Sequence, residues 1–295
     1  MLDILPQLIV SGILIGGVYG LLSIGLTLIF GVLRIVNFAQ GEFIMLAMFG
    51  AFWLNLLFGI DPYLSILIVA PAIYVLGLLT ERIVVRPILH APHAMQIFAT
   101  FAVSVILQNL ALTLWGPDYR SVQASYSTTS FVVGQVSIAA TSLYAFLTAL
   151  AMAALLVAFL NFTREGRALR AMVQNRYAAS LMGIDTERLN RVAFGVGVAC
   201  AAVAGCILTP IYYTFPGAGV DLIITAFVVV VLGGLGSVTG AVVGGLIIGI
   251  TQTLTGFFIS VELKDLIALG LFLLILLVRP QGLFGRVGME EVGTK

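Results

Sequence analysis

The chain has 295 residues, of which 61% are hydrophobic and only 9% are charged, and its formal net charge is +1. A soluble domain carries roughly 25% charged residues, and a soluble protein of this length has too little interior to hide so much apolar surface. The composition therefore excludes a soluble globular protein. The sequence also has no basic stripe, which excludes a nucleic-acid-binding protein. It indicates a chain that is solvated mainly by lipid.

The apolar stretches of the chain match the length of membrane-spanning helices, which need about 20 mostly apolar residues. The N-terminus carries Asp3 but no Lys or Arg before Gln7, so it lacks the basic region of a cleaved signal peptide and the first stretch is expected to be retained. The long apolar stretches are residues 8–33, 41–60, 63–80, 96–115, 137–161, 192–213, 222–258 and 264–279.

The stretch 222–258 is too long for one span, and the glycine-rich run 232–237 within it predicts a turn between two shorter helices. Basic residues mark three regions that the positive-inside rule places in the cytoplasm, whereas the loop 116–136 holds a single Arg. These regions contain Arg82 and Arg86, the segment from Arg164 to Arg191, and Arg279 with Arg286. The pattern predicts about nine transmembrane helices, with the N-terminus outside and the C-terminus cytoplasmic.

Small residues indicate how these helices pack. Gly12, Gly16 and Gly20 recur every four residues, and two similar series begin at Gly197 and Gly236. In lipid no hydrophobic force presses helices together, so close backbone approach over small residues contributes to holding them. We therefore expect an all-α polytopic bundle that forms a single transmembrane domain over residues 1–295.

A polar break, residues 34–42, separates the first two apolar stretches and contains Asn37, Gln40 and Glu42. A charged group at the bilayer centre costs roughly 2.5–3.5 kcal/mol on insertion scales and persists where it pairs or lines a cavity. Two interpretations remain open at this point. The segment is either an ordinary cytoplasmic turn or a broken helix that lines a translocation pathway.

Two segments of the sequence predict an inverted repeat. Residues 38–49 loosely resemble residues 215–227, and each segment ends a break with an acid, Glu42 in one and Asp221 in the other. In the predicted topology the two breaks face opposite sides of the membrane. Transporters often place their pathway at discontinuous helices in corresponding positions of two such halves. Chance similarity of two short segments is the alternative.

The segment 162–191 is the longest polar stretch and is predicted to be cytoplasmic. A helix through 167–182 would be amphipathic, with Gly183 ending it and Asp185 capping the next helix. Its apolar face would hold Leu169, Met172 and Val173, and its polar face Arg167, Arg170 and Gln174. Such a helix could dock on a soluble partner, or it could lie on the membrane surface without one.

Several types of chemistry lack their sequence signals. Lys264 and Lys295 are the only lysines, and neither follows a glycine-rich loop, so no phosphate-binding P-loop is predicted. His90 and His93 lie in a proline-containing loop without nearby cysteine, which favours a solvated loop over a metal site. No hydrolase elbow or zinc-protease motif occurs, so a membrane-embedded enzyme is disfavoured.

Taken in order along nearly the whole chain, four stretches resemble permease subunits of branched-chain amino acid ABC transporters, of the LivH type. They are residues 25–31 with 37–42; 81–82 with 86–87; 166–171 with 178–185; and 232–237 with Gly240 and Gly244. The resemblance departs from the family pattern at two positions. Gln40 stands where family members commonly have His, and Thr225 stands where many have Lys before the Ala-Phe pair, which puts in doubt any role borrowed through those two residues.

The resemblance implies a heteromeric importer in a bacterial or archaeal plasma membrane. Its partners would be a second homologous permease, two cytoplasmic ATPase subunits and a periplasmic or surface substrate-binding protein. ATP would be bound by the partners, and this chain would hold no cofactor and no metal. The expected ATPase-coupling residues are Arg167, Arg170, Arg176, Ala178, Ala179, Gly183 and Asp185. The expected pathway residues are Asn37, Gln40, Glu42, Asp221 and Thr225.

The mechanism expected from this resemblance is alternating access driven by the partner ATPases, with branched-chain or related amino acids as substrates. The chain itself would make or break no bond and would not be an enzyme. The alternative is an ion-coupled secondary transporter of amino acids or amides, in which Glu42 or Asp221 serves as a proton or ion site. The two hypotheses differ in whether ATPase and binding-protein subunits co-purify with the chain.

Overall fold

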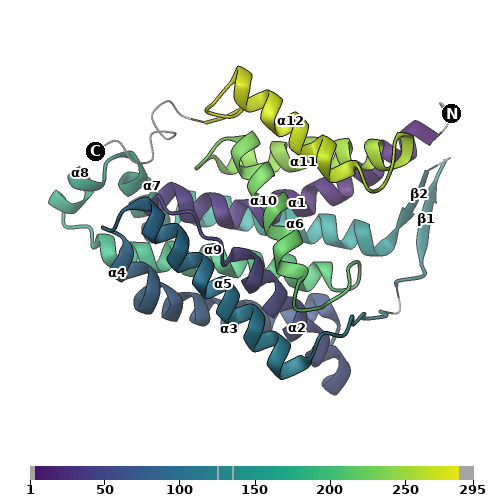
Figure 1. The fold of residues 1–295 in the computed structure, drawn as a ribbon, viewed down its shortest axis with the longest axis horizontal. Helices are drawn as coiled ribbons and strands as arrows, with labels where there is room; N and C mark the ends of the chain where they lie inside the picture. Colours follow the sequence, from purple (N-terminus) through teal and green to yellow (C-terminus); the bar gives the residue numbers. More distant parts are fainter. Residues whose placement is uncertain (1–3, 125, 135, 286–295) are drawn as a thin grey trace.

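A computed structural model describes residues 4–124, 126–134 and 136–285 and is mostly helical (Figure 1). Within this described part, seven helices are long and apolar enough to cross a membrane. They are α1 (Leu5–Leu33), α2 (Gln40–Phe58), α3 (Pro62–Thr80, extended to Ile88 by a π-helical turn, Glu81–Val85, and by α4, Arg86–Ile88), α5 (His93–Trp115), α6 (Ala140–Phe162), α9 (Thr186–Leu208) and α11 (Val238–Phe258). The chain is therefore a polytopic helical membrane protein, as its composition predicts.

Two further apolar helices are shorter, α10 (Ala218–Gly233) and α12 (Lys264–Val278). The predicted turn within 222–258 is confirmed, because α10 ends at Gly233 and α11 starts at Val238. The turn uses glycine where the backbone is left-handed, with φ of 81° at Gly236. The 16 residues of α10 extend only about 24 Å, less than a hydrocarbon core of about 30 Å. The predicted count of nine spans is thus not confirmed.

A β-hairpin that the sequence analysis did not predict precedes α6. Strands β1 (Ser130–Val133) and β2 (Val136–Ala139) pair antiparallel, with Ser130 opposite Ala139. The apolar stretch predicted as a span from residue 137 therefore begins as a strand, and α6 starts only at Ala140. Half-buried and exposed residues alternate along β2, which is the two-residue period of a strand and differs from the helical period.

The centre of the bundle is held by glycine contacts between backbones. A Cβ at Gly16 of α1 would lie 2.7 Å from the carbonyl oxygen of Gly245 in α11, and one at Gly12 would lie 2.7 Å from Cα of Ile250. On another face of α1, a Cβ at Gly197 of α9 would lie 2.7 Å from the carbonyl oxygen of Gly25. The dense packing predicted from glycine spacing is confirmed at these contacts, which leave no room for larger side chains.

Helix contacts in the first half of the chain have counterparts in the second half. The contact of α1 with α11 corresponds to that of α9 with α3; α2 with α3 corresponds to α10 with α11; and α2 with α5 corresponds to α10 with α12. The two leading helices run antiparallel, because Gly25 of α1 packs on Gly197 whereas the earlier Tyr19 reaches Tyr212, beyond the end of α9.

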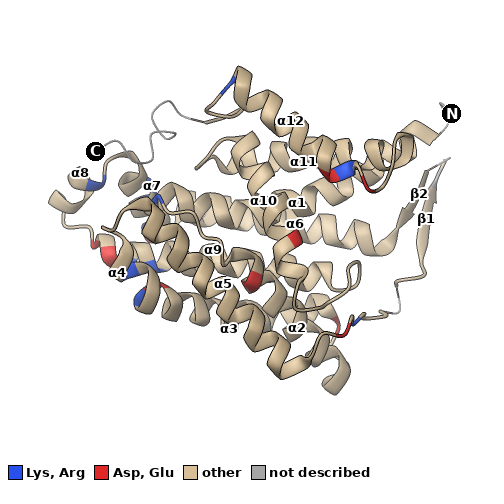
Figure 2. Ribbon diagram, viewed as in Figure 1, with Lys and Arg blue, Asp and Glu red and all other residues tan. Residues whose placement is uncertain are grey.

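The bundle has two chemically different ends. At one end, which we call the α7–α8 end after helices α7 (Arg164–Gln174) and α8 (Arg176–Leu181), Arg residues gather (Figure 2). There Arg86 pairs with Glu187 and Arg188 with Glu165, and the backbone N–H of Leu283 donates to the carbonyl of Leu232.

At the opposite end, the hairpin end, the loop after α5 is joined to the loop after α9. The backbone groups of Arg120 and Thr214 bond in both directions, at 3.0 and 2.7 Å. The Arg120 guanidinium also lies over the rings of Phe52 and Trp53, 5.4 and 5.2 Å from their centroids. The loop 116–136, which the charge pattern does not place in the cytoplasm, is thus in contact with the loop after α9.

Candidate functional site

The polar break between α1 and α2 turns back into the bundle. The helix α1 ends at Leu33, and Arg34 adopts a left-handed backbone with φ of 57°. When α2 begins at Gln40, that side chain is fully buried, and its Nε2 donates to the carbonyl of Gly197 in α9 at 3.1 Å. Gly197 packs on Gly25, which lies about 12 Å along α1 before its end. The second helix therefore starts inside the bundle, as a broken helix does.

Three of the predicted pathway residues are brought together at this break. Asn37 donates to Oε1 of Gln40 at 3.1 Å and accepts from the backbone N–H of Ala39 at 3.2 Å. Ser104 of α5 donates to Oε1 of Glu42 at 3.1 Å. Asn37, Gln40 and Glu42 are each at most 1% exposed. These side chains lie in the interior of this chain and fix the start of α2 against α5 and α9.

The N-termini of α2 and α10 meet in the middle of the bundle. A Cβ at Gly219 of α10 would lie 2.7 Å from the carbonyl oxygen of Gly41 and 2.8 Å from Oε2 of Glu42. Two helix N-termini place like partial positive charges together, and a carboxylate at that junction offsets their repulsion. Oε2 of Glu42 accepts no hydrogen bond from the described residues. Glu42 thus lies where two discontinuous helices converge.

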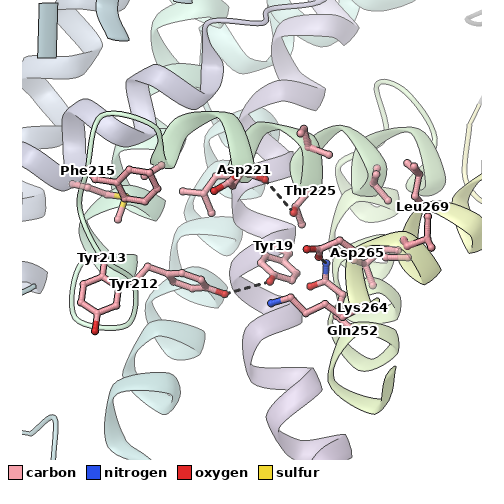
Figure 3. Close-up of a pocket in the computed structure, with 18 residues that line it drawn as sticks. Tyr19, Tyr212, Tyr213, Phe215, Asp221, Thr225, Gln252, Lys264, Asp265 and Leu269 are labelled. Atoms are coloured by element: carbon pink, nitrogen blue, oxygen red, sulfur yellow. Dashed lines mark hydrogen bonds between the residues drawn. The ribbon is translucent and has the colours of Figure 1, made fainter. Parts of the chain in front are cut away.

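The other two predicted pathway residues, Asp221 and Thr225, lie elsewhere, in a cavity of about 550 Å³ among α1, α10, α11 and α12 (Figure 3). Neither Asn37, Gln40 nor Glu42 lines this cavity. The polar residues around it that sequence reasoning did not select are Tyr19, Tyr212, Gln252, Lys264 and Asp265. One signal for them was present in the sequence, because Lys264 and Asp265 are adjacent charges at the head of an apolar stretch.

The segment 162–191 forms two helices, α7 and α8, where one helix through 167–182 was predicted. That prediction is wrong because Asn175 breaks the helix. Its backbone is extended, with φ of −154°, and its side chain accepts from the N–H of Ala178 at 2.9 Å. An Asn that caps a following helix competes with continuation of the preceding one.

The amphipathic pattern of α7 is confirmed. Leu169 and Met172 are 1% and 3% exposed, whereas Arg167 and Arg170 are exposed. Val173 is half-buried beside them. The helix therefore packs its apolar face on the bundle and presents its arginines outward.

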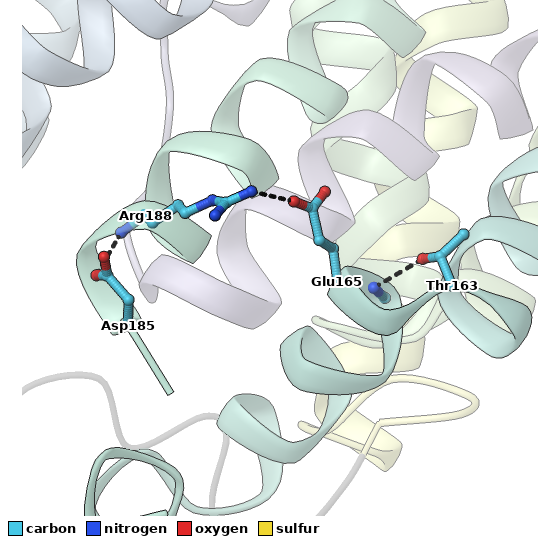
Figure 4. Close-up of polar contacts among 5 residues, drawn as sticks. Thr163, Glu165, Asp185 and Arg188 are labelled. Atoms are coloured by element: carbon cyan, nitrogen blue, oxygen red, sulfur yellow. Dashed lines mark hydrogen bonds and ion pairs between the residues drawn. The ribbon is translucent and has the colours of Figure 1, made fainter. Parts of the chain in front are cut away.

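The predicted helix boundaries that follow are also confirmed. Gly183 has φ of 78° just after α8, and the Asp185 side chain accepts from the N–H of Arg188 at 2.9 Å at the start of α9 (Figure 4). In the same view Arg188 reaches back to Glu165 at 2.7 Å, and Thr163 caps α7 by accepting from the N–H of Gly166 at 2.9 Å. These contacts hold α7 beside the start of α9.

The surface of α8 is exposed and largely apolar. Tyr177, Leu181 and Met182 are 74%, 70% and 82% exposed, and Arg176 and Ala178 are exposed beside them. Ala179 differs from the expectation that it faces outward, because it is 4% exposed and belongs to the core cluster of this chain. Ala179 is therefore the small residue through which α8 packs on the bundle. The exposed residues on either side of it are the ones that can contact a partner.

Comparisons with known proteins place these features in a family context. Residues 8–276 match the family described as branched-chain amino acid transport system / permease component. The chain is 34% identical to the high-affinity branched-chain amino acid transport system permease protein LivH of Escherichia coli K12, with 97% of each chain covered.

Two further relatives show similar coverage. The permease protein BraD of Pseudomonas aeruginosa is 31% identical over 97% of each chain. The probable permease protein LivH of Methanocaldococcus jannaschii is 29% identical, covering 96% of this chain and 94% of its own. No solved structure matches the chain.

Proposed function

Because the chain belongs to the permease family of branched-chain amino acid transport systems, we propose that it is one permease subunit of an ATP-driven importer of these amino acids. It is a multi-pass plasma membrane protein. In the proposed assembly the whole chain forms one transmembrane domain and pairs with a second, homologous permease. Two cytoplasmic ATPase subunits bind the ATP, a substrate-binding protein delivers the amino acid, and this chain holds no cofactor.

The observation that carries this proposal is the exposed surface of α8. Tyr177, Leu181 and Met182 project from a short helix at the arginine-rich end of the bundle. Exposed apolar groups rimmed by charge mark sites of contact with a protein or a membrane, and we propose a protein here. A cleft on an ATPase subunit would cover these side chains. Arg167, Arg170 and Arg176 would flank the contact, Gly183 and Asp185 would define its end, and ATP binding would move the permease through it.

We further propose that the α7–α8 end is cytoplasmic, the hairpin end faces outside, and α10 and α12 complete nine crossings despite their length. Contacts between the basic loops support this orientation. Single cysteines at Arg120, Gly236 and Gln281, in a background lacking Cys200 and Cys206, would be probed with an impermeant thiol reagent on intact cells. Only position 120 should react. Labelling of position 236 from outside would overturn the orientation and the double crossing.

The matched helix contacts and the meeting of α2 with α10 support an inverted repeat and alternating access around that junction. In this proposal Asn37, Gln40 and Glu42 fix one half of the pathway. Asp221 and Thr225 lie along the second half. The two permease halves then tilt against each other when the ATPases close.

The function is tested by reconstituting the chain in proteoliposomes with its sister permease, the two ATPases and the binding protein. Uptake of radiolabelled leucine should require every partner subunit and should require ATP on the side of the membrane where the ATPase subunits lie. ADP on that side should not support uptake. Leucine accumulation by this chain alone under a proton or sodium gradient would contradict the proposal and favour the secondary transporter.

A further inference from the structure

The cavity among α1, α10, α11 and α12 combines charged groups of both signs with apolar walls. Asp221 comes from the first turn of α10, and Lys264 and Asp265 come from the first turn of α12. Its volume of about 550 Å³ falls within the range of small-molecule sites, about 300–1,000 Å³. Most other lining residues are aliphatic or aromatic, including Met48, Leu222 and Ile248. The cavity therefore offers a mixed polar and apolar environment of ligand size.

The charged side chains that line this cavity form no ion pair with one another. Within the described part of the chain the only ion pairs are Arg86–Glu187 and Arg188–Glu165, so Lys264 pairs with neither acid beside it. Asp265 is engaged differently, since it accepts from Nε2 of Gln252 at 2.8 Å. The Asp221 carboxylate accepts no side-chain hydrogen bond from the described residues, whereas its backbone carbonyl accepts from the Thr225 hydroxyl at 3.4 Å. A cation and an anion are thus both available to a ligand.

The hydroxyl groups lie on the same side as the cation. Tyr19 of α1 and Tyr212 share a hydrogen bond of 3.4 Å between their hydroxyl oxygens. In Figure 3 the Lys264 side chain extends toward this tyrosine pair, with Gln252 and Asp265 close to it and Asp221 across the cavity. An ammonium with two neighbouring hydroxyls is suited to a carboxylate, and a separate carboxylate is suited to an ammonium.

We propose that this cavity binds the zwitterionic head group of an aliphatic amino acid during its passage, a role that rests on the proposed function. Lys264, with Tyr19 and Tyr212, would receive the α-carboxylate, and Asp221 would receive the α-ammonium. The aliphatic side chain would lie on the apolar wall formed by Met48, Leu222 and Ile248. A zwitterion that is removed from water needs a counter-charge for each of its ends, and this cavity supplies both.

The test measures protection of a cysteine in the complete transporter complex, held in phosphatidylcholine nanodiscs. Ile224 lines the cavity and is 55% exposed, so Ile224→Cys serves as the reporter, while the native Cys200 and Cys206 are fully buried and stay unlabelled. The probes are L-leucine, isocaproate, which lacks the ammonium, and isoamylamine, which lacks the carboxylate. At a concentration ten times its dissociation constant, leucine should slow maleimide labelling roughly tenfold.

Removing one charge from the cavity should change which ligand protects the reporter cysteine. A general disturbance of the fold would weaken protection by all ligands alike. Lys264→Met should weaken leucine protection about tenfold and make isoamylamine as effective as leucine. Asp221→Asn should also weaken leucine protection about tenfold, and it should make isocaproate as effective as leucine. Glu262→Gln, which removes a charge from the exposed loop just before α12 and outside the cavity lining, should protect like the parent.

Equal leucine protection in all three variants would overturn the site, as would labelling that changes when phosphatidylethanolamine is added to the nanodiscs and ignores leucine. Failure of leucine to protect even the parent, when the same complex reconstituted in proteoliposomes still imports leucine with ATP, would also remove the site and leave the proposed function intact. Charge-dependent protection in a complex that shows no ATP-driven uptake would leave the site standing and remove the function.

Discussion

The helices α1 and α8 differ in how completely the chain covers them. In α1, 20 of 29 residues are buried, and Gly12 and Gly16 lie against backbone atoms of α11. In α8, one of six residues is buried, Ala179, and the side chains of Tyr177 and Leu181 project away from the bundle. Both helices are rich in apolar or small residues, so composition alone does not distinguish them.

The difference separates contacts that the chain completes by itself from contacts that it leaves for another protein. Damage to the α1 contacts should prevent the chain from folding, because nothing else can fill that role. Damage to the surface of α8 should leave the chain folded and remove only the partner. The predictions below test this separation, and their expected effects decrease in order.

The largest effect is expected for Gly249→Val in α11. A Cβ there would lie 2.5 Å from the carbonyl oxygen of Gly12 and 2.6 Å from the N of Gly16, and these backbone atoms cannot move without shifting α1. Overpacking typically costs about 1–3 kcal/mol and more where backbone must move. The variant should yield little monodisperse protein by size-exclusion chromatography in mild detergent.

Gly256→Val is the matched control, because Gly256 lies in the same helix and a Cβ there meets no atom within 4 Å. It should behave like the parent. If both variants yield normal protein, close contact of α1 with α11 does not hold the bundle together.

A large effect on assembly, without an effect on folding, is expected for Ala178→Glu. Ala178 is exposed on α8 between Tyr177 and the buried Ala179, so a carboxylate there would be buried without a partner in the proposed ATPase cleft. Co-purification of the ATPase should fall about tenfold or more, which corresponds to about 1.4 kcal/mol. The same substitution at Ala171, exposed on α7, should spare it. Equal loss from both positions would mean that the contact is not confined to α8, and normal co-purification with Ala178→Glu would place it elsewhere.

Gly183 gives a smaller and graded effect. With φ of 78° it requires a left-handed backbone, which costs a residue with a Cβ roughly 1–2 kcal/mol. Gly183→Val should weaken ATPase binding and binding-protein-stimulated ATP hydrolysis, whereas Gly183→Asn should retain most of both, because Asn tolerates this conformation better. A Val variant with normal stimulation would show that the orientation of α8 does not matter for coupling.

The sequence determined most of the fold because lipid imposes a simple rule, that long apolar runs become helices. Where the rule failed, a local preference decided. Asn175 caps α8 and so divides a helix that amphipathic spacing alone predicts as continuous. Alternation around Ser137 forms a strand where hydropathy predicts a span. Neither the break nor the hairpin changes the average hydropathy of its window, so a window average could not reveal them.

The candidate site was less predictable, because it depends on which residues meet across the chain. Sequence similarity of two breaks pointed to Glu42 and Asp221 together, yet the structure buries Glu42 and places Asp221 in a cavity with Lys264. The short Ala179 was expected to fit a partner cleft and instead seats α8 on its own bundle. A small residue fits either environment equally well, and only the contacts decide between them.

Glu42 belongs to the buried region yet has an ionisable side chain, so it tests whether a buried residue of this chain can serve transport as well as packing. Its carboxylate lies between the N-termini of α2 and α10, where its interaction with the helix dipoles is worth typically 0.3–1 kcal/mol and up to about 2 kcal/mol when partly buried. Glu42→Gln should keep the hydrogen bond from Ser104, assemble normally and lower leucine uptake several-fold. Glu42→Asp, which retains the charge, should transport better than Glu42→Gln. Normal uptake by Glu42→Gln would assign this residue to packing alone.

The smallest effect is expected for the ion pair of Arg188 with Glu165, which joins α7 to the start of α9. Its side chains are 64% and 41% exposed, and exposed pairs contribute about 0–1 kcal/mol after screening by solvent and salt. Arg188→Met, Glu165→Gln and the double variant should therefore keep ATPase binding, and uptake should fall by less than about fivefold.

The deficit in uptake should also disappear when the parent and the variants are compared at high salt, which screens the ion pair in the parent. The three variants should show equal uptake, because removing either partner already removes the interaction. A tenfold loss of uptake that persists in high salt would mean that this contact transmits force between α7 and α9, and α7 would then belong with the coupling surface and not with the self-contained bundle.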